Sequence, residues 1–300
     1  MAVIATGFFD GVHLGHRRVI QTLFSSARER GEAAGVVTFA QHPRAVLLQD
    51  ARGLRLLNAP QEREALLRSL GVDRVDALPF DRAFARMTAG RYIREVLQDR
   101  FGATALVLGY DNRLGSDRLT PDRIRPLALS LGLDVTLVPA EEIAFPGLPP
   151  LTVSSTKIRE ALDRGEAGLA RAMLGYAYSL RGVVVGGKQL GRTLNYPTAN
   201  LRLYDPMKLI PARGVYLTEV EVLGRRCSGM TNVGDIIETH IFDFCEDIYG
   251  LDLRVTFLQR LRDGRCFGTL AELKSQLEAD ERACRALLAR TGAQDCLFQK

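Results

Sequence analysis

Apolar runs of strand length alternate with helically spaced apolar residues from Met1 to about Tyr176. The apolar runs predict strands at residues 2–6, 35–39, 72–78, 104–108 and 133–138. Helical spacing, often bounded by proline or glycine, predicts helices at residues 14–30, 61–70, 89–101 and 121–131. Because strands that alternate with helices pair in parallel through right-handed crossovers, we expect a doubly wound α/β sheet.

The pattern changes after Gly175. Strand candidates at residues 180–185, 215–223, 240–244 and 253–261 are separated by Gly, Pro and Asp turns, and no convincing helix appears before residues 270–288. This pattern is typical of a small antiparallel β domain, a sandwich or a barrel, that ends in one helix. We therefore expect two domains, residues 1–177 and residues 178–300.

The composition is that of a globular protein, since 46% of the 300 residues are hydrophobic and 25% are charged. Forty basic residues against thirty-five acidic ones give a net charge of +5, which favours anionic ligands such as phosphates, nucleotides or nucleic acid. No apolar run is long enough for a membrane helix, and the start of the chain lacks the basic segment of a signal peptide. The five cysteines form no CxxC pair, so we expect reduced thiols in a cytoplasmic protein rather than disulfides or a zinc site.

Two of the four histidines lie in an HxGH motif that directly follows the first predicted strand. In an open parallel sheet, ligands bind beyond the carboxyl ends of the strands, and a glycine turn before a helix N-terminus attracts phosphates. Gly11 supplies such a turn, and His13 and His16 occupy the start of the following helix, where imidazoles donate to phosphate oxygens. The alternative is that the two histidines only cap the helix.

A second polar segment, SSTKIR at residues 154–159, opens another helix. The hydroxyls of Ser155 and Thr156 are ordinary capping groups at a helix start. Lys157 and Arg159 oppose the helix dipole there, and an anion held between the hydroxyls, the amide N–H groups and Arg159 would compensate. The segment is therefore either part of a phosphate site or a capped surface helix.

The second half begins with a run of glycine and basic residues at 182–192, which includes Lys188 and Arg192. The run lacks a Walker A motif, so it is either a phosphate-binding loop of another kind or a glycine-rich hairpin. Thr198 and Asn200 follow within a few residues. Their side chains offer hard oxygen ligands of the kind that Mg²⁺ accepts, which makes this segment a candidate metal site.

A carboxylate marks a later part of this half. Glu238 stands two residues before His240, and alternation along a strand puts both side chains on one face. Both side chains could therefore face a ligand cleft. The alternative is that both side chains are only solvated.

The N-terminal motifs carry a family resemblance. GFFDGVHLGH together with VSSTKIR resembles the HxGH-type nucleotidyltransferases, and TFAQHP and LGYDNRLG are similar to the TFxPHP and GxDFxFG segments of the bacterial bifunctional riboflavin kinase/FAD synthetase family. The resemblance implies transfer of AMP from ATP to FMN, with catalytic roles for His13 and His16 and a place near the flavin for Asp111. It implies ATP phosphate binding by Gly11, Ser155, Thr156 and Arg159. The sequence departs from the family at Asn112 and Leu114, where phenylalanines are usual.

The C-terminal motifs GxxxGRxLxxPTAN, ETHIFDF, DIYG and LR resemble riboflavin kinase, in the order of that family. The resemblance implies a six-stranded antiparallel barrel in which Glu238 is the base for the riboflavin 5′-hydroxyl and Arg262 lies near the flavin. It implies phosphate neutralisation by Lys188 and Arg192, and Mg²⁺ binding with the nucleotide by Thr198 and Asn200. The loop between Gly234 and Glu238 is shorter than in the family, and Asn195 and Tyr196 replace the usual glycine and phenylalanine.

We therefore expect a bifunctional enzyme that phosphorylates riboflavin to FMN and adenylylates FMN to FAD, with ATP as co-substrate and Mg²⁺ as cofactor. The alternative is an FMN adenylyltransferase whose kinase module binds flavin but is degenerate, which the short loop motivates. A nucleic-acid-binding or flavin-sensing regulator is a third class, but the sequence shows no helix-turn-helix, RRM or aromatic-basic stripe. We expect neither nucleic acid nor a membrane as a partner, and the sequence leaves the oligomeric state open.

Overall fold

The computed structural model describes residues 1–47, 53–145, 149–187 and 190–295, with only the backbone described for residues 190, 192 and 291–295. The chain divides into two compact units, Met1–Lys157 and Ile158–Lys300. The division falls inside one helix, so this helix contributes to both units. The domain boundary after residue 177 stays a prediction, and each unit is described by itself.

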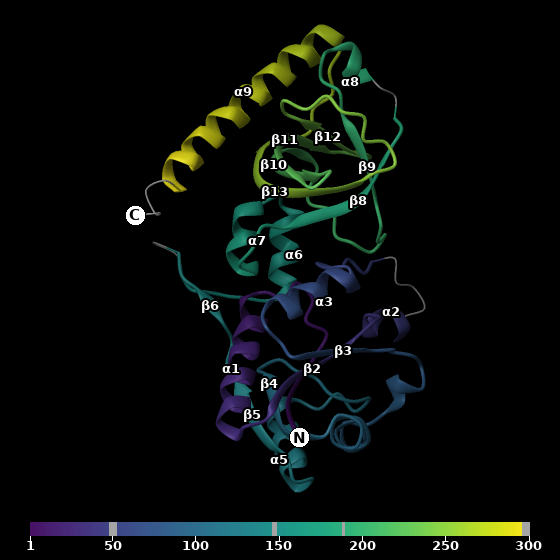
Figure 1. Ribbon diagram of the computed structural model, residues 1–300, viewed down its shortest axis with the longest axis vertical. Coiled ribbons are helices and arrows are strands. Elements are labelled where there is room, and N and C mark those ends of the chain that lie inside the picture. Colours follow the sequence, from purple (N-terminus) through teal and green to yellow (C-terminus); the bar gives the residue numbers. More distant parts are fainter. Residues whose placement is uncertain (48–52, 146–148, 188–189, 296–300) are drawn as a thin grey trace. The chain divides into compact units, whose positions relative to one another are not determined.

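The first unit is built on five parallel strands in the order β3-β2-β1-β4-β5 (Figure 1). The strands are β1 (Ala2–Thr6), β2 (Ala33–Phe39), β3 (Arg74–Leu78), β4 (Ala103–Gly109) and β5 (Asp134–Val138). The chain runs outward from β1 to β3 and then returns to β4 on the other side, which confirms the doubly wound sheet. The strand order therefore reverses between β1 and β4, and ligands bind at the carboxyl edge of such a switch point.

Helices cover both faces of this sheet. They are α1 (Leu14–Arg30), α2 (Pro43–Leu47), α3 (Pro60–Ser69), α4 (Ala89–Arg91) and α5 (Pro121–Ser130), with the 3₁₀ turn η1 (Phe84–Arg86) and the π-helical segment η2 (Tyr92–Gln98). Val3 packs with α1 and α3, whereas its neighbour Ile4 packs with η2 and α5 on the opposite face. Because both faces are buried, β1 is apolar throughout, as central parallel strands are. A short antiparallel pair, β6 (Glu142–Ile143) and β7 (Leu151–Thr152), completes the unit.

The second unit contains a closed antiparallel barrel in the order β10-β11-β12-β9-β8-β13 (Figure 1). The strands are β8 (Ser179–Val185), β9 (Ala199–Leu203), β10 (Gly214–Val222), β11 (Arg225–Val233), β12 (Ile237–Ile241) and β13 (Asp252–Arg262). The helices are α6 (Ser155–Asp163), α7 (Ala167–Leu174), α8 (Leu190–Thr193) and α9 (Leu270–Asp295), of which α9 packs against β11 and β13. The six-stranded barrel and its terminal helix are confirmed.

Two details of the barrel differ from the sequence prediction. The strand expected at residues 240–244 lies at Ile237–Ile241 instead, because Ile237, Thr239 and Ile241 alternate into the interior. Strands β9 and β11 were not predicted. Their sequences, ANLRL and RRCSGMTNV, are too polar and contain too few β-branched residues to stand out.

Threonines form a hydrogen-bonded row through the barrel interior. The Thr231 hydroxyl lies 2.9 Å from the hydroxyls of both Thr218 and Thr239, and the Thr218 hydroxyl donates to the carbonyl of Gly229. All three threonines are fully buried, so these mutual bonds offset the cost of placing hydroxyls in a core. Among the described residues, no helix is both long and apolar enough to cross a membrane.

Candidate active sites

The turn between β1 and α1 has an unusual backbone. Phe9, Gly11 and Val12 adopt φ angles of 57°, 86° and 37°. Glycine accepts this left-handed region freely, but a β-branched residue such as Val12 does not. Both non-glycine residues are buried, so packing holds them in this conformation. Backbone strain of this kind concentrates at functional sites, and here it lies at the switch point of the sheet.

His13 and His16 lie together at the start of α1. His13 is the N-cap, and its Nδ1 accepts a hydrogen bond from the His16 backbone N–H at 3.4 Å. A neutral His13 ring therefore carries its proton on Nε2, so that its hydrogen-bond donor is Nε2 and its acceptor is Nδ1. The two rings are stacked with centroids 3.7 Å apart. Capping and ligand binding are therefore compatible, because the cap uses only one of the four ring nitrogens.

His16 is held as a neutral donor. Burial lowers the pKa of His16 well below its usual range, and the neighbouring His13 lowers it further. Its Nδ1 is buried without a hydrogen-bond partner among the described residues. An unpaired buried nitrogen is costly in the free protein and becomes favourable when a ligand supplies its partner.

Asp10 connects the HxGH turn to two distant segments. Its carboxylate accepts hydrogen bonds from the backbone N–H groups of Leu57 and Asn58 at 3.0–3.1 Å. Its carbonyl oxygen accepts a hydrogen bond from the Ser155 hydroxyl at 2.8 Å. The structure thereby brings together the two N-terminal motifs that the sequence predicted to share a site.

The hydroxyls of the SSTKIR segment have separate roles. Ser154 caps α6, because its Oγ accepts a hydrogen bond from the Lys157 N–H at 3.3 Å. Ser155 is tied to Asp10, while the Thr156 side chain is exposed at the helix start. Arg159 lies one turn further along the same helix. Capping therefore occupies one hydroxyl of the segment.

Asp111 and Asn112 follow β4, the other strand at the switch point. Asp111 is exposed. The Asn112 side chain accepts a hydrogen bond from the Gly109 N–H at 2.7 Å and donates one to the Thr6 carbonyl at 2.8 Å. Asn112, one of the departures from the family pattern, thus joins the ends of β1 and β4. Leu114, the other departure, is buried in the core.

The barrel brings Asn200 and Glu238 side by side. Glu238 of β12 is directly opposite Asn200 of β9 and Asn232 of β11, and its side chain is partly exposed. Asn200 is 6% exposed, and its Oδ1 has no hydrogen-bond partner among the described residues. The backbone at Gly187 passes so close that a Cβ there would overlap the Asn200 amide. The segment after β8 thus encloses an unpaired oxygen beside a carboxylate.

His240 fixes the segment that carries Thr198. Its Nδ1 lies 2.9 Å from the carbonyl oxygen of Pro197. Next to it, the Tyr196 hydroxyl donates to Glu281 of α9 at 3.0 Å, and burial, together with that carboxylate, raises the pKa of Tyr196 to about 12. Tyr196, which replaces the family phenylalanine, therefore ties this segment to α9. Asn195 has φ of 64°, a conformation that asparagine tolerates better than most residues in place of glycine.

A cavity of about 470 Å³ opens beside these residues. Its lining includes Thr198 and the buried Thr239, with Phe244, Ile248 and Tyr249 from the segment between β12 and β13. Apolar walls with a few polar groups are typical of a small-molecule site, and the volume suits a nucleotide or a flavin ring system. The DIYG motif thus lies at a cavity, a location that its sequence does not indicate.

Arg262, another predicted site residue, forms contacts with the C-terminal helix. All three guanidinium nitrogens of Arg262 are engaged: Nε and Nη2 donate to the buried Asp280 of α9, and Nη1 donates to the Asp263 carbonyl. Arg262 thus anchors α9 to β13, and its place near the flavin stays a prediction. Lys188 lies outside the described residues, as does the side chain of Arg192.

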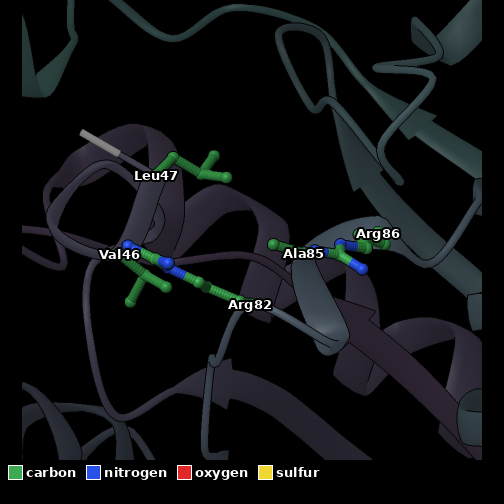
Figure 2. Close-up of a pocket in the computed structure, with 5 residues that line it drawn as sticks. All are labelled: Val46, Leu47, Arg82, Ala85 and Arg86. Carbon is green, nitrogen blue, oxygen red and sulfur yellow. The ribbon is translucent and has the colours of Figure 1, made fainter. Parts of the chain in front are cut away.

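A second hollow, of about 310 Å³, lies between α2 and η1 in the first unit (Figure 2). Arg82 extends toward Val46, whereas Arg86 lies on the far side of Ala85 (Figure 2). The two guanidinium groups do not converge, and none of the predicted site residues lines this hollow. It is therefore not part of the candidate sites.

Comparison with known families identifies both units. Residues 1–146 match the FAD synthetase family, and residues 174–288 match the riboflavin kinase family. The fold and the two sites thus define a class of enzyme that joins an FAD synthetase domain to a riboflavin kinase domain.

The chain is 34% identical over 298 residues to the bifunctional riboflavin kinase/FMN adenylyltransferase of Pseudomonas fluorescens, covering 96% of this chain and 93% of that protein. The Escherichia coli K12 protein of the same name is 33% identical over 300 residues with the same coverage. The chain belongs to the bifunctional riboflavin kinase/FMN adenylyltransferase family. A crystal structure from Streptococcus pneumoniae described as a macrolide-efflux protein has a TM-score of 0.85 and 34% identity, covering 95% of this chain and 93% of that one.

Proposed function

We propose that this chain makes FMN from riboflavin and FAD from FMN, using ATP in both reactions. Membership of the family supports the pair of activities. The observation that carries the proposal is that each unit brings two of its motif segments together. The Ser155–Asp10 hydrogen bond joins the two motifs of the first unit, and the Asn200–Glu238 pair lies on adjacent strands of the second.

In the first unit, an FMN phosphate oxygen attacks the α-phosphorus of ATP, and pyrophosphate leaves. His13 and His16 donate to the triphosphate, with Gly11 giving the backbone close approach to it. The phosphates are further bound by Ser155, Thr156 and Arg159. A neutral His16 suits this role, because a fixed donor in a water-poor site stabilises developing negative charge without proton transfer. Asp111, exposed at the end of β4, is assigned to the flavin.

In the second unit, the riboflavin 5′-hydroxyl attacks the γ-phosphorus of ATP, and ADP leaves. Glu238 orients that hydroxyl and accepts its proton. The cavity beside Thr198 takes the nucleotide, with its apolar wall against the base. Lys188 and Arg192 neutralise phosphate charge, and Arg262 is assigned to the flavin side.

The residues present fit a Mg²⁺ ion bound together with the nucleotide. Asn200 offers an enclosed oxygen that has no hydrogen-bond partner within the described ranges, and Thr198 supplies a second hard oxygen in the same segment. Among the described residues, no cluster of three or more His, Cys, Asp or Glu side chains could hold a metal ion, so phosphates and water would complete the ligand set. When bound, Mg²⁺ neutralises phosphate charge and fixes the orientation of the transferred group.

The short connection before Glu238 is compatible with an active kinase. β11 ends at Val233 and β12 begins at Ile237, with a tight turn closed by a hydrogen bond from the Gly234 N–H to the Ile236 carbonyl at 3.1 Å. The register that sets Glu238 opposite Asn200 is kept. This register favours two activities over a kinase module that only binds flavin.

We place the enzyme in the cytoplasm, without nucleic acid or membrane partners. The four cysteines that the structure describes are free thiols, in accord with a reducing compartment.

The decisive experiment is a product analysis of the purified full chain with Mg²⁺ and ATP, given riboflavin or FMN. We expect FMN and then FAD from riboflavin, and FAD from FMN. Formation of FAD from FMN, with no FMN from riboflavin, would instead indicate a degenerate kinase module. No product from either flavin would refute the proposal.

A further inference from the structure

Arg63 of α3 is a buried cation that neither sequence motif includes. The side chain is 1% exposed, and one of its nitrogens, Nη2, donates to the Phe39 carbonyl. Nε and Nη1 have no hydrogen-bond partner among the described residues. Burial lowers the pKa of Arg63 to about 10, while the charge of Asp10 opposes that shift. Even so, the guanidinium stays charged at neutral pH. An incompletely paired buried charge costs stability, so stability alone does not explain it.

The groups around Arg63 include residues directly before the HxGH motif of the first unit. Its guanidinium carbon lies 4.1 Å from the centre of the Phe8 ring, over the ring face. The Phe8 ring also contacts the ring of His42, and the two ring centres lie 4.4 Å apart. The negative charge that favours the charged form of Arg63 most is that of Asp10. Arg63 therefore contacts or attracts the two residues that flank Phe9, where the left-handed backbone begins.

Arg63 also joins two strand ends. Phe39 ends β2, while Phe8 and Asp10 follow β1, the neighbouring strand. Asp10 in turn accepts the Ser155 hydroxyl and the N–H groups of Leu57 and Asn58. A displacement of Arg63 would move Phe8, which it contacts, and through the adjoining turn it would reach Asp10, which joins the two motifs. Displacements of about 1 Å in such a site can reduce rates by about 10²-fold.

We propose that Arg63 is a positioning residue for adenylyl transfer, which holds the Phe8 ring and the Phe39 carbonyl so that the adjoining strained HxGH turn and Ser155 keep their arrangement. This inference rests on the proposed FAD synthetase activity of the first unit. Arg63 does not touch substrate in this role. Its effect is exerted through the two residues that it holds.

Three full-length variants test the role. Arg63→Met removes the charge but keeps much of the side-chain volume, and Arg63→Lys keeps the charge without the planar donor group. Arg68→Met is the matched control, because Arg68 lies on the same helix but is exposed and paired with Glu64. The readouts are kcat and KM for FAD formation from FMN, FMN formation from riboflavin, and the melting temperature.

We expect Arg63→Met to lower kcat for FAD formation by at least about 10-fold, with a much smaller change in the KM for ATP. The melting temperature should not fall, because an underpaired buried charge has been removed. Arg63→Lys should recover part of kcat, and Arg68→Met should match the wild type. FMN formation should be unchanged in all three variants.

Two results would overturn the inference while leaving the proposed function intact. One is normal FAD formation by Arg63→Met. The other is a loss of activity that follows a lowered melting temperature and is not relieved in Arg63→Lys, which would mark a purely structural residue. Absence of FAD from the wild-type chain would refute the proposed function itself, and this inference with it.

Discussion

The Ser155 hydroxyl donates a hydrogen bond of 2.8 Å to the carbonyl oxygen of Asp10, a residue 145 positions earlier in the chain. Asp10 stands in the strained turn before the HxGH helix, and Ser155 is the first residue of α6. The bond therefore places the start of α6, near the end of the first unit, beside the turn that follows β1 near its beginning. The two motifs therefore lie side by side, which supports the proposal that they line one anion site.

The first prediction concerns His16. His16→Ala should lower FAD formation from FMN by about 10²-fold, because it removes a fixed donor from the triphosphate site. FMN formation from riboflavin should be retained, since that reaction is assigned in our proposal to Glu238 and Asn200 of the other unit. Both activities are measured on the same preparation of full-length chain. An equal loss of both would contradict the assignment of separate sites.

The second prediction is a dependence of stability on pH. The folded-state pKa of His16 is depressed below the unfolded value of about 6.5, so the unfolded chain binds the proton first as the pH falls. The contribution of His16 to stability is therefore complete above that pH and is lost below it. Unfolding monitored by circular dichroism should show a smaller acid destabilisation in His16→Asn than in the wild type. His42→Asn is the control, and identical pH profiles for wild type and His16→Asn would contradict the prediction.

The third prediction concerns Glu238. Glu238→Gln keeps the shape of the side chain but cannot accept the riboflavin proton, so FMN formation should fall by about 10²-fold while riboflavin still binds. Glu219→Gln on β10, outside the proposed site, is the matched control. Flavin fluorescence titration separates binding from turnover. Full kinase activity in Glu238→Gln would show that another group accepts the proton.

The fourth prediction uses two adjacent glycines. Gly187→Ala would drive a methyl group into the Asn200 amide, whereas a Cβ at Gly186 meets nothing within 4 Å. Gly187→Ala should therefore raise the KM for Mg-ATP in FMN formation, and Gly186→Ala should leave it unchanged. FAD formation from FMN serves as the internal control for both. Equal KM values in the two variants would argue against Asn200 as part of the nucleotide and metal site.

The sequence predicted regular elements well where several signals agreed. The helix at residues 14–30 has the predicted ends, because its apolar face is periodic and Gly31 adopts the left-handed conformation that ends helices. The helix expected at 89–101 is largely π-helical, a difference that no apolar pattern reveals. In the barrel, β9 carries Asn200 of the candidate site, and β11 carries Thr231 of the interior threonine row. Because of such polar residues, the apolar pattern did not predict these two strands.

Spacing identified the site motifs but not the residues that hold them. Asp10 stands inside a predicted motif, yet its hydrogen-bonding partners Leu57, Asn58 and Ser155 lie in segments far along the chain. Arg63 is one of several charged residues on an amphipathic helix, and only the packed structure shows that it is buried. Arg262 belongs to a predicted motif, but its ion pair with Asp280 depends on how α9 packs. Such contacts depend on tertiary packing, which a local pattern does not encode.

The two sheets differ in how they end. Every strand of the barrel is paired on both sides, whereas β3 and β5 each have, within the described part of the chain, one side without a neighbouring strand. An unpaired strand edge is a template for pairing with other chains, and β5 also exposes Leu137. Because the first unit leaves the ribosome before the barrel is made, its edges are exposed earliest. The yield of soluble protein during synthesis should therefore depend mainly on β3 and β5, and charged substitutions on their outer sides are the direct way to improve it.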